Sequence, residues 1–519
     1  MNLIKPDFKH YIIFFAIVLI LPSSSYSQNI QMDIHGFISQ GYLKSDSGDF
    51  MAKTEEGTFD FNECGINFIS NINKKFHLGI QFFSRDFGDF DNNTINIDWA
   101  YGDYRYRDYL GFRIGQVKIP YGLYNEIRDI DFLRTSILLP ISIYKESWRD
   151  SLTSIKGFGF YGDIPLNKLG DLSYQCIYGQ PKLPPDGGIS NLVENYGNFD
   201  VKEIIADDLF AVQVTWDTFL QGLLLRTTFA STTFDGLYQS NDLFAWGDIR
   251  LSMDIQNQLP GQLEPILMSK INEKSLSKSL TDQYIKLLTP DSMKSLNSSW
   301  PKEFSDEYES VTFLLYSLKY QNNNFTLESE YEFLRLKSSR TLLENNQLLH
   351  NDVQNHIGFY VNTSYRFTDW LEIGCYYSVT YYDEDDKSGD YFASLNNRDS
   401  FKYPVLLRYN GTSQEIQQSF KQYANQAFSK IAPGIQLTDE DIKNIQLIPN
   451  YTLENVNFHD YCAWLKDFVI SVRMDINENW IVKLEGHFMD GIYLMDFSDN
   501  LGNTSPKRFL FATKVTYSF

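Results

Sequence analysis

The sequence predicts an all-β protein, a transmembrane antiparallel β-barrel of about 16 strands. Three observations lead to this prediction. The carboxyl end alternates apolar and polar residues and stops on an aromatic one. Strand-like segments are joined by connections that alternate between short and long. Aromatic residues make up 16% of the 519 residues, an excess that the two aromatic girdles of a membrane barrel would use.

The segment 508–519 has two distinct faces when it is written as a strand. One face is apolar and mostly aromatic, with Phe509, Phe511, Val515, Tyr517 and Phe519. The other is polar, with Arg508, Lys514, Thr516 and Ser518. This pattern is typical of the closing strand of a bacterial outer-membrane barrel. The last strand of a soluble sandwich can look the same, so the remaining strands must decide.

The amino end predicts export. Basic residues at 5 and 9 precede an apolar run over 11–21, which is too short to span a bilayer, and Ser25-Tyr26-Ser27 follows. We therefore expect a signal peptide over residues 1–27, cleaved before a barrel over 28–519. No Cys follows the cleavage point, which argues against a lipoprotein anchor.

Composition excludes other classes. No later apolar run is long enough for a membrane-spanning helix. The formal net charge of -21 argues against a nucleic-acid partner. The four cysteines lie far apart and match no metal or redox spacing. A mean hydropathy of -0.32 resembles that of a soluble protein, but a barrel places apolar residues only at every second position.

Strand-like segments recur in pairs along the chain. We expect strands at 30–43, 57–72, 76–87, 95–106, 110–119, 153–163, 171–180, 208–217, 222–231, 309–321, 324–337, 355–367, 370–382, 464–476, 480–491 and 508–519. The connections alternate short and long, which places both termini in the periplasm and long extracellular loops at 232–308 and 383–462. A soluble sandwich has no reason to sort its connections in this way.

Alternation also assigns the lumen face. We expect Glu328, Glu330 and Glu332 to point inward at successive positions about 7 Å apart. By the same pattern the lumen receives Arg113, Arg473, Lys483 and Glu485, while the apolar neighbours of these residues face lipid. A polar and charged interior predicts water, and hence a channel without a packed core.

The connection 120–152 combines many charges with the apolar run 137–141. Because such an apolar run is unfavourable in a solvent-exposed loop, we expect the connection to fold into the barrel and form a constriction. Its charged residues Glu126, Arg128, Asp131 and Arg134, with Arg113, would then lie at or near the narrowest point. The alternative is a flap over the barrel rim.

Two of the other loops contain helical patterns. Thr412 and Glu415 form a capping box, and apolar residues follow at helical spacing up to 431. Residues 263–288 show a weaker pattern of the same kind. We expect small helices in these extracellular loops.

No catalytic constellation, metal-ligand motif or cofactor motif appears. We therefore expect no enzyme, no metal and no cofactor. Three alternatives stay open: an outer-membrane hydrolase, for which His487 would be the residue to test; a surface adhesin that uses the large loops; and a ligand-gated receptor. The receptor would need a plug domain before the barrel, whereas strands begin soon after residue 28.

Four segments carry a family resemblance: DWAYGDYR (98–105), RIGQVKIPYGLYNE (113–126), RDIDFLRTSILLP (128–140) and KLEGH (483–487). Through them the chain resembles outer-membrane porins related to the phosphate-selective porin O and P group, most specifically between residues 59 and 162. The resemblance implies a sixteen-stranded barrel, an inward third loop and often a homotrimer. It does not imply phosphate, because that selectivity rests on ladders of Arg and Lys where this chain carries Glu328, Glu330 and Glu332.

These observations predict a porin of the bacterial outer membrane, a passive diffusion channel for small hydrophilic solutes or ions. We expect only a weak cation preference, because Arg113, Arg226, Arg473 and Lys483 would oppose the glutamates. The expected partners are outer-membrane lipid, lipopolysaccharide and the barrel-assembly machinery, which would read Phe519. No nucleic acid is expected.

Overall fold

The computed structural model describes residues 32–88, 90–184, 187–190, 199–240, 302–343, 346–390, 392, 438, 459–494 and 505–519. Three features expected from the sequence lie outside these residues: the signal peptide at 1–27 and the loop helices at 263–288 and 412–431.

The described strands form one antiparallel sheet. They are β1 (Met32–Ser45), β2 (Phe61–Asn71), β3 (Phe76–Phe87), β4 (Asn96–Arg107), β5 (Leu110–Lys118), β6 (Ser154–Pro165), β7 (Gly170–Pro181), β8 (Phe199–Ala206), β9 (Leu209–Thr218), β10 (Leu223–Ser240), β11 (Lys302–Asn322), β12 (Phe325–Leu342), β13 (Gln347–Arg366), β14 (Leu371–Tyr381), β15 (Trp464–Asp475), β16 (Trp480–Asp490) and β17 (Lys507–Ser518).

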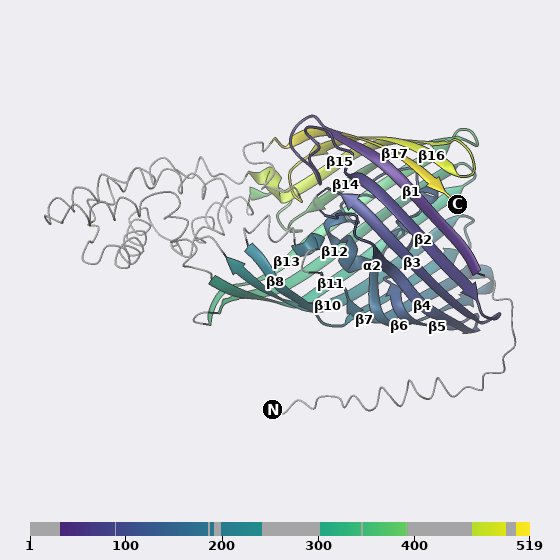
Figure 1. Ribbon diagram of the computed structural model, residues 1–519, viewed down its shortest axis with the longest axis horizontal. Helices are drawn as coiled ribbons and strands as arrows, with labels where there is room; N and C mark the ends of the chain where they lie inside the picture. Colours follow the sequence, from purple (N-terminus) through teal and green to yellow (C-terminus); the bar gives the residue numbers. More distant parts are fainter. Residues whose placement is uncertain are drawn as a thin grey trace, which may run out of the picture.

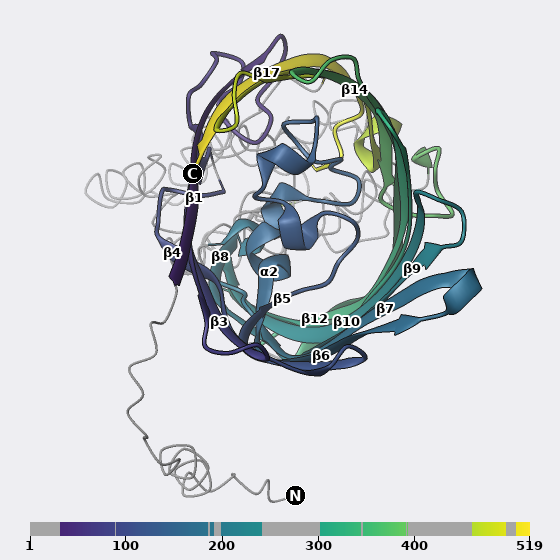
Figure 2. The same ribbon diagram turned by 90° about the vertical axis from the view of Figure 1, so that its right-hand side faces the viewer.

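The sheet closes on itself, because β1 pairs with both β2 and β17. Strands β8 and β9 pair one after the other with the same neighbour, β10, so together they fill one position in the ring. The described strands thus make a closed barrel of sixteen positions (Figure 2). The predicted segments correspond to these positions, and β8 is the one described strand that the sequence reading missed.

The two ends of the barrel differ. Short turns gather at one end, where the backbone of Phe519 exchanges two hydrogen bonds of 3.0 Å with Gly36. We call this the turn end and the opposite end the loop end. At the loop end β10 to β13 run farther than predicted, up to the 21 residues of β11, and with β8 they project past the rim (Figure 1).

Side chains alternate across the barrel wall as predicted. On β16, Leu484 and Phe488 are exposed on the outer surface, while Lys483, Glu485 and His487 are buried inside. Strands β15 and β17 show the same alternation. The alternation arises because successive residues of a strand point to opposite faces of the sheet. The outer surface is therefore largely apolar and the inner one largely polar. Within the described residues, no helix has the length and hydropathy needed to cross a membrane.

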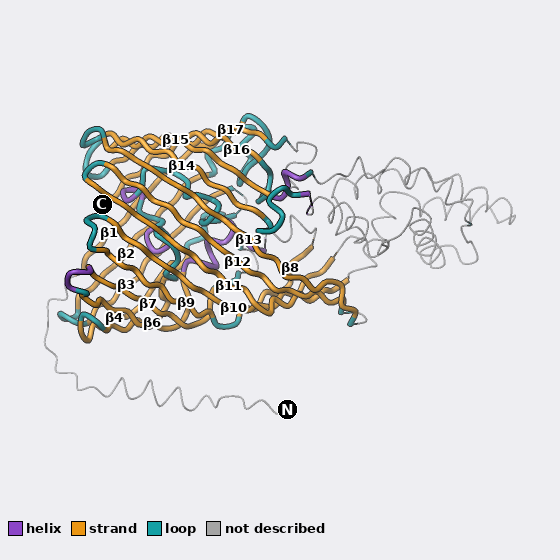
Figure 3. The backbone as a smooth tube through the Cα atoms, turned by 180° about the vertical axis from the view of Figure 1, so that it is seen from behind, coloured by secondary structure: helices purple, strands orange, loops and turns teal. Residues whose placement is uncertain are grey.

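The connection between β5 and β6, which we call the inner loop (residues 120–152), lies inside the barrel as predicted (Figure 2). It contains three short 3-10 helices, η1 (Asn125–Ile127), η2 (Asp131–Leu133) and η3 (Glu146–Trp148). The short helix α2 (Arg149–Thr153) then leads into β6. In the view from behind, these helical turns lie inside the barrel, surrounded by the strands (Figure 3).

The interior is not the uniformly polar, water-filled lumen that we expected. The inner loop packs against apolar residues of the wall, among them Leu315, Leu334 and Tyr360. Toward the loop end, its apolar run packs on Phe61, Leu465 and Leu510. Alternation in a single strand cannot reveal this, because an inward apolar residue gains a partner only when the loop fills the barrel. The expectation that the barrel has no packed core was therefore wrong.

Candidate functional site

The base of the inner loop, where the chain leaves and rejoins the wall, is held by the side chains of Asn125 and Arg226. The Asn125 side chain donates hydrogen bonds to the carbonyl oxygens of Ile119 (3.0 Å) and Leu152 (2.6 Å), which ties the beginning of the loop to its end. Gly122, with φ of 59°, makes the turn into the lumen, a backbone conformation that favours glycine. Its carbonyl oxygen accepts a hydrogen bond of 2.8 Å from Arg226 on β10. The chain is thereby directed inward from the wall.

Glu330 on β12 is the main acceptor for the base of the loop. Its carboxylate accepts hydrogen bonds from the Tyr144 hydroxyl (2.5 Å) and the backbone N–H of Leu123 (2.9 Å). Ser317 (2.5 Å) and Tyr360 (2.9 Å) donate to it from the wall. Burial and the neighbouring carboxylate raise the pKa of Tyr144 well above its usual value, so its hydroxyl stays protonated and donates.

The other two glutamates of this strand also bind loop residues. Glu328 accepts a hydrogen bond from the Tyr124 hydroxyl and pairs with Lys319 at 2.9 Å. Glu332 pairs with Lys145 at 2.9 Å. All three glutamates point inward as predicted, but each is only 1% exposed. Our expectation that they line open water is corrected: they are anchors of the inner loop, with Glu328 paired to Lys319, Glu332 paired to Lys145, and Glu330 held by uncharged donors.

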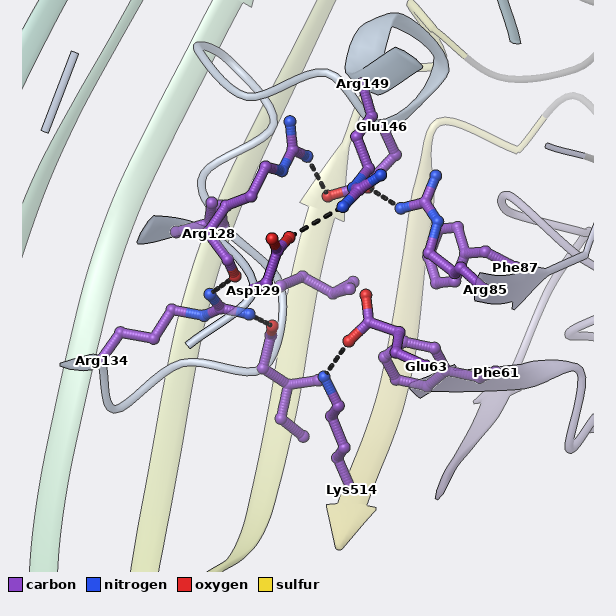
Figure 4. Close-up of a pocket in the computed structure, with 13 residues that line it drawn as sticks. Phe61, Glu63, Arg85, Phe87, Arg128, Asp129, Arg134, Glu146, Arg149 and Lys514 are labelled. Carbon is purple, nitrogen blue, oxygen red and sulfur yellow. Dashed lines mark hydrogen bonds and ion pairs between the residues drawn. The ribbon is translucent and has the colours of Figure 1, made fainter. Parts of the chain in front are cut away.

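Opposite these anchors, the loop forms an ionic network with β3 and β4. Glu146 lies between Arg85 (2.5 Å) and Arg128 (3.1 Å), as Figure 4 shows. Arg149 binds Asp129 at 2.8 Å and lies 3.7 Å from Asp98. Burial alone would raise the pKa of Glu146, but the charges of Arg128 and Arg85 prevail and lower it to about 2. Glu146 is therefore ionised at neutral pH.

The tip of the loop, residues 131–141, binds β16 and β17. Asp131 accepts a hydrogen bond of 2.6 Å from Thr516 and lies 3.0 Å from Lys514 and 3.5 Å from Lys483. Arg134, on the loop itself, binds the same carboxylate at 3.2 Å. Although burial opposes ionisation, the lysine charges lower the pKa of Asp131. The tip is thus fixed by a carboxylate that three cations surround.

Two further contacts hold the tip from β15 and β16. Arg473 donates a hydrogen bond of 2.7 Å to the carbonyl oxygen of Phe132. Glu485 accepts hydrogen bonds from the backbone N–H groups of Ile137 (2.7 Å) and Leu138 (3.0 Å). The inner loop therefore spans the barrel between opposite walls.

The predicted site residues fall into two groups. The structure brings Arg128, Asp131, Arg134, Glu328, Glu330, Glu332, Arg473, Lys483 and Glu485 onto the inner loop or into contact with it. Glu126 is also on the inner loop, but its side chain and that of Arg113 on β5 form a separate group of contacts. Arg113 pairs with Asp103 at 2.8 Å and lies over the Tyr161 ring. Gln175 lies between them, 3.1 Å from Glu126 and 3.5 Å from Arg113.

Several residues of the site were not among the predicted ones. They are Glu63, Arg85, Asp98, Asp129, Lys145, Glu146, Arg149 and Lys514. One sequence signal could have predicted two of these residues, which lie on the barrel wall. Glu63 and Arg85 carry opposite charges at directly paired positions of the hairpin formed by β2 and β3. Charges facing each other at inward positions point to an ionic network in the lumen.

A narrow cleft remains between the loop and strands β2, β3 and β17. Arg85, Arg128, Arg134, Arg149 and Lys514 line it together with Glu63, Asp129 and Glu146 (Figure 4). Within the described part of the chain, no group of three or more His, Cys, Asp or Glu side chains could hold a metal ion. The charged side chains of the cleft are instead engaged in contacts within the loop, within the wall and between the two.

The closed ring, its apolar outer surface and its inner loop define a transmembrane antiparallel β-barrel. The search of family models and the search of curated proteins both gave no match.

Among solved structures, the chain is similar to OmpF of Salmonella typhi in complex with daunomycin, with a TM-score of 0.46 and 10% identity over 95% of this chain and 99% of that one. It is similar to the anion-selective porin from Comamonas acidovorans, with a TM-score of 0.44 and 8% identity over 94% of this chain and 99% of that one. It is also similar to the outer membrane channel DcaP of Acinetobacter baumannii, with a TM-score of 0.43 and 8% identity over 95% of this chain and 99% of that one.

Proposed function

We propose that this protein is a passive diffusion channel of the bacterial outer membrane, with the inner loop as its constriction. The observation that carries the proposal is the loop itself, which runs across a closed barrel and binds opposite walls through Glu330 on β12 and Arg85 on β3. Any solute that passes through the barrel must pass this loop.

The charges near the turn end suit small hydrophilic solutes or ions. Arg366 lies 3.2 Å from Glu372 and 3.0 Å from Asp475, and each of these side chains is partly exposed. Arg113 and Asp103 form a similar pair farther round the ring. Both signs of charge therefore border the pathway, which supports a weak selectivity. The cation preference expected from Glu328, Glu330 and Glu332 loses its main basis, because those carboxylates are buried and hydrogen-bonded.

The apolar outer surface supports contact with outer-membrane lipid and lipopolysaccharide. Phe519, half exposed at the turn end, is a suitable group for recognition by the barrel-assembly machinery. The resemblance to the phosphate-selective porin O and P group lies mainly in β4, β5 and the inner loop, and a homotrimer belongs to the same proposal. We assign no phosphate site, since Glu328, Glu330 and Glu332 stand where that group carries basic ladders.

Single-channel conductance in planar bilayers tests the function. We expect the purified protein to conduct, and we expect a higher conductance after residues 126–146 are replaced by a short Gly-Ser linker. A deletion of the same length within residues 241–301 is the matched control. Folding of each variant is checked by heat-modifiable gel mobility. If neither the complete chain nor the loop variant conducts while both are folded, the proposed function is wrong.

A further inference from the structure

A row of three charged side chains leads from the barrel wall to the tip of the inner loop. Glu485 on β16 is the last member of the row, and its two carboxylate oxygens accept the backbone N–H groups of Ile137 and Leu138 at 2.7 and 3.0 Å. Two consecutive N–H groups bound by one carboxylate fix both the position and the direction of the chain. Hydrogen bonds of this kind, to an ionised acceptor, are stronger than neutral ones.

His487 holds Glu485 in place from behind. Its Nε2 lies 2.9 Å from Glu485 and its Nδ1 lies 2.8 Å from Asp467 on β15. A neutral imidazole has only one N–H, so one of its nitrogens would face a carboxylate oxygen without a hydrogen. With both carboxylates ionised, the two distances are satisfied by the imidazolium, which donates to each of them. The ring therefore carries a positive charge between two negative ones.

The row is shielded from water. The three side chains are at most 2% exposed, and the apolar residues Ile137, Leu138 and Leu465 pack at the same end of the barrel. In such surroundings, a carboxylate that loses its partner pays a large desolvation cost, so the members of the row depend on one another. Removing one member should therefore disturb the loop tip beyond the loss of a single contact.

We propose that Asp467, His487 and Glu485 act as a latch that fixes the tip of the inner loop and thereby sets the width of the pathway. The three are positioning residues, since they act through the backbone of Ile137 and Leu138. This inference rests on the proposed channel function for its effect on conduction. The placement of the loop by the latch is a separate, structural consequence.

The direct test is the variant Glu485→Gln. An amide presents one acceptor and one donor where the loop offers two donors, so one N–H of the tip loses its partner. The conservative second variant, Asp467→Asn, acts at the far end of the row and leaves the acceptors of Ile137 and Leu138 intact. The control is Glu478→Gln, which removes a charge from the exposed turn that precedes the same strand.

The first readout is thiol reactivity and needs no conduction. It uses Thr135→Cys, a buried tip position, in a background without native cysteines (Cys64→Ser, Cys176→Ser, Cys375→Ser and Cys462→Ala). We expect Glu485→Gln to speed labelling by a water-soluble maleimide at least about tenfold, because a hydrogen bond to a charged group favours the closed state by more than that factor. Asp467→Asn should give a smaller increase and Glu478→Gln none.

The second readout is single-channel current. We expect the wild-type channel to show one steady current level, and the Glu485→Gln channel to show larger currents that fluctuate between levels. A disulfide between Thr135→Cys and Gly374→Cys can then replace the latch, because a Cβ at position 374 would lie 3.3 Å from that of Thr135. Oxidation of the pair should restore the steady level, and reduction should abolish it again.

The outcomes separate the two proposals. Faster labelling in Glu485→Gln without any channel current would keep the latch and overturn the channel function. Unchanged labelling and unchanged current in folded Glu485→Gln and Asp467→Asn would overturn the latch. A tethered variant that still fluctuates after oxidation would also overturn it, since the current would then not depend on the position of the tip.

Discussion

Gly358 on β13 lies directly against Ser142 of the inner loop, so closely that a Cβ at position 358 would be 2.1 Å from the Ser142 carbonyl oxygen. The Ser142 hydroxyl donates a hydrogen bond of 3.1 Å to the carbonyl oxygen of the next wall residue, Phe359. The loop can approach the wall here because position 358 has no side chain. The wall of the barrel is thus shaped to receive this loop.

Replacing Gly358 by valine should push the loop away from β13. Because the clash is with backbone, neither partner can move aside cheaply, and we expect a loss of about 1–3 kcal/mol in the free energy of unfolding. Conductance should rise or fluctuate as the loop shifts. Gly102→Ala is the matched control, since a Cβ there would meet only ordinary contacts of 3.4 Å or more. Equal behaviour of the two variants would contradict the close docking of the loop.

Glu330→Gln should destabilise the protein without much change in its selectivity. The amide cannot accept from all four donors that surround the carboxylate, and hydrogen bonds to a charged group contribute about 1.5–3 kcal/mol each. Urea titration in lipid vesicles measures the stability, and reversal potentials in a salt gradient measure the selectivity. A large shift of the reversal potential toward anions would show that Glu330 faces the conducting water after all.

Glu146 should make stability depend on pH at the acidic end. Its pKa in the folded protein is about 2, below the usual 4.5, so the folded state binds fewer protons than the unfolded state between these values. The stabilisation is complete above pH 4.5 and is lost as the pH falls toward 2. At about 1.4 kcal/mol per pKa unit, this amounts to about 3 kcal/mol.

The variant Glu146→Gln isolates that contribution. It should be less stable than the wild type at pH 7, and the difference should shrink as the pH approaches 2. Asp108→Asn is the control, because the Asp108 side chain is 93% exposed and its removal should change stability little at any pH. A stability difference that stays constant from pH 7 to pH 2 would show that the ionic network with Arg85 and Arg128 is not what Glu146 contributes.

The orientation in the membrane can be tested by tag accessibility. We expect tags inserted after Lys278 and after Gln418, both outside the described residues, to be labelled on intact cells. A tag in the turn 477–479, at the end of the barrel that holds Phe519, should be labelled only after the outer membrane is opened. The reverse pattern would place the turn end on the cell surface.

The sequence by itself determined the repeating architecture. Alternation is a local property, because successive side chains of a strand point to opposite sides. It therefore predicted which residues of β12, β15, β16 and β17 point inward, and it predicted the sixteen positions of the ring. The apolar run 137–141 predicted an inward loop, because such a run needs buried surroundings. Of the strands that the structure describes, only β8 was missed, because it continues β9 beyond a break at Asp207 and Asp208.

The tertiary structure alone decided what the inward residues contact. Tyr144 and Glu330 are 186 positions apart, and Ile137 and Glu485 are 348 apart. Their meeting depends on the tilt and stagger of the strands and on the path of the loop across the lumen, which no local pattern encodes. This is why the glutamates of β12 were predicted to line water and proved to be buried anchors. A charge at an inward position is defined by the sequence, but its exposure depends on what fills the barrel.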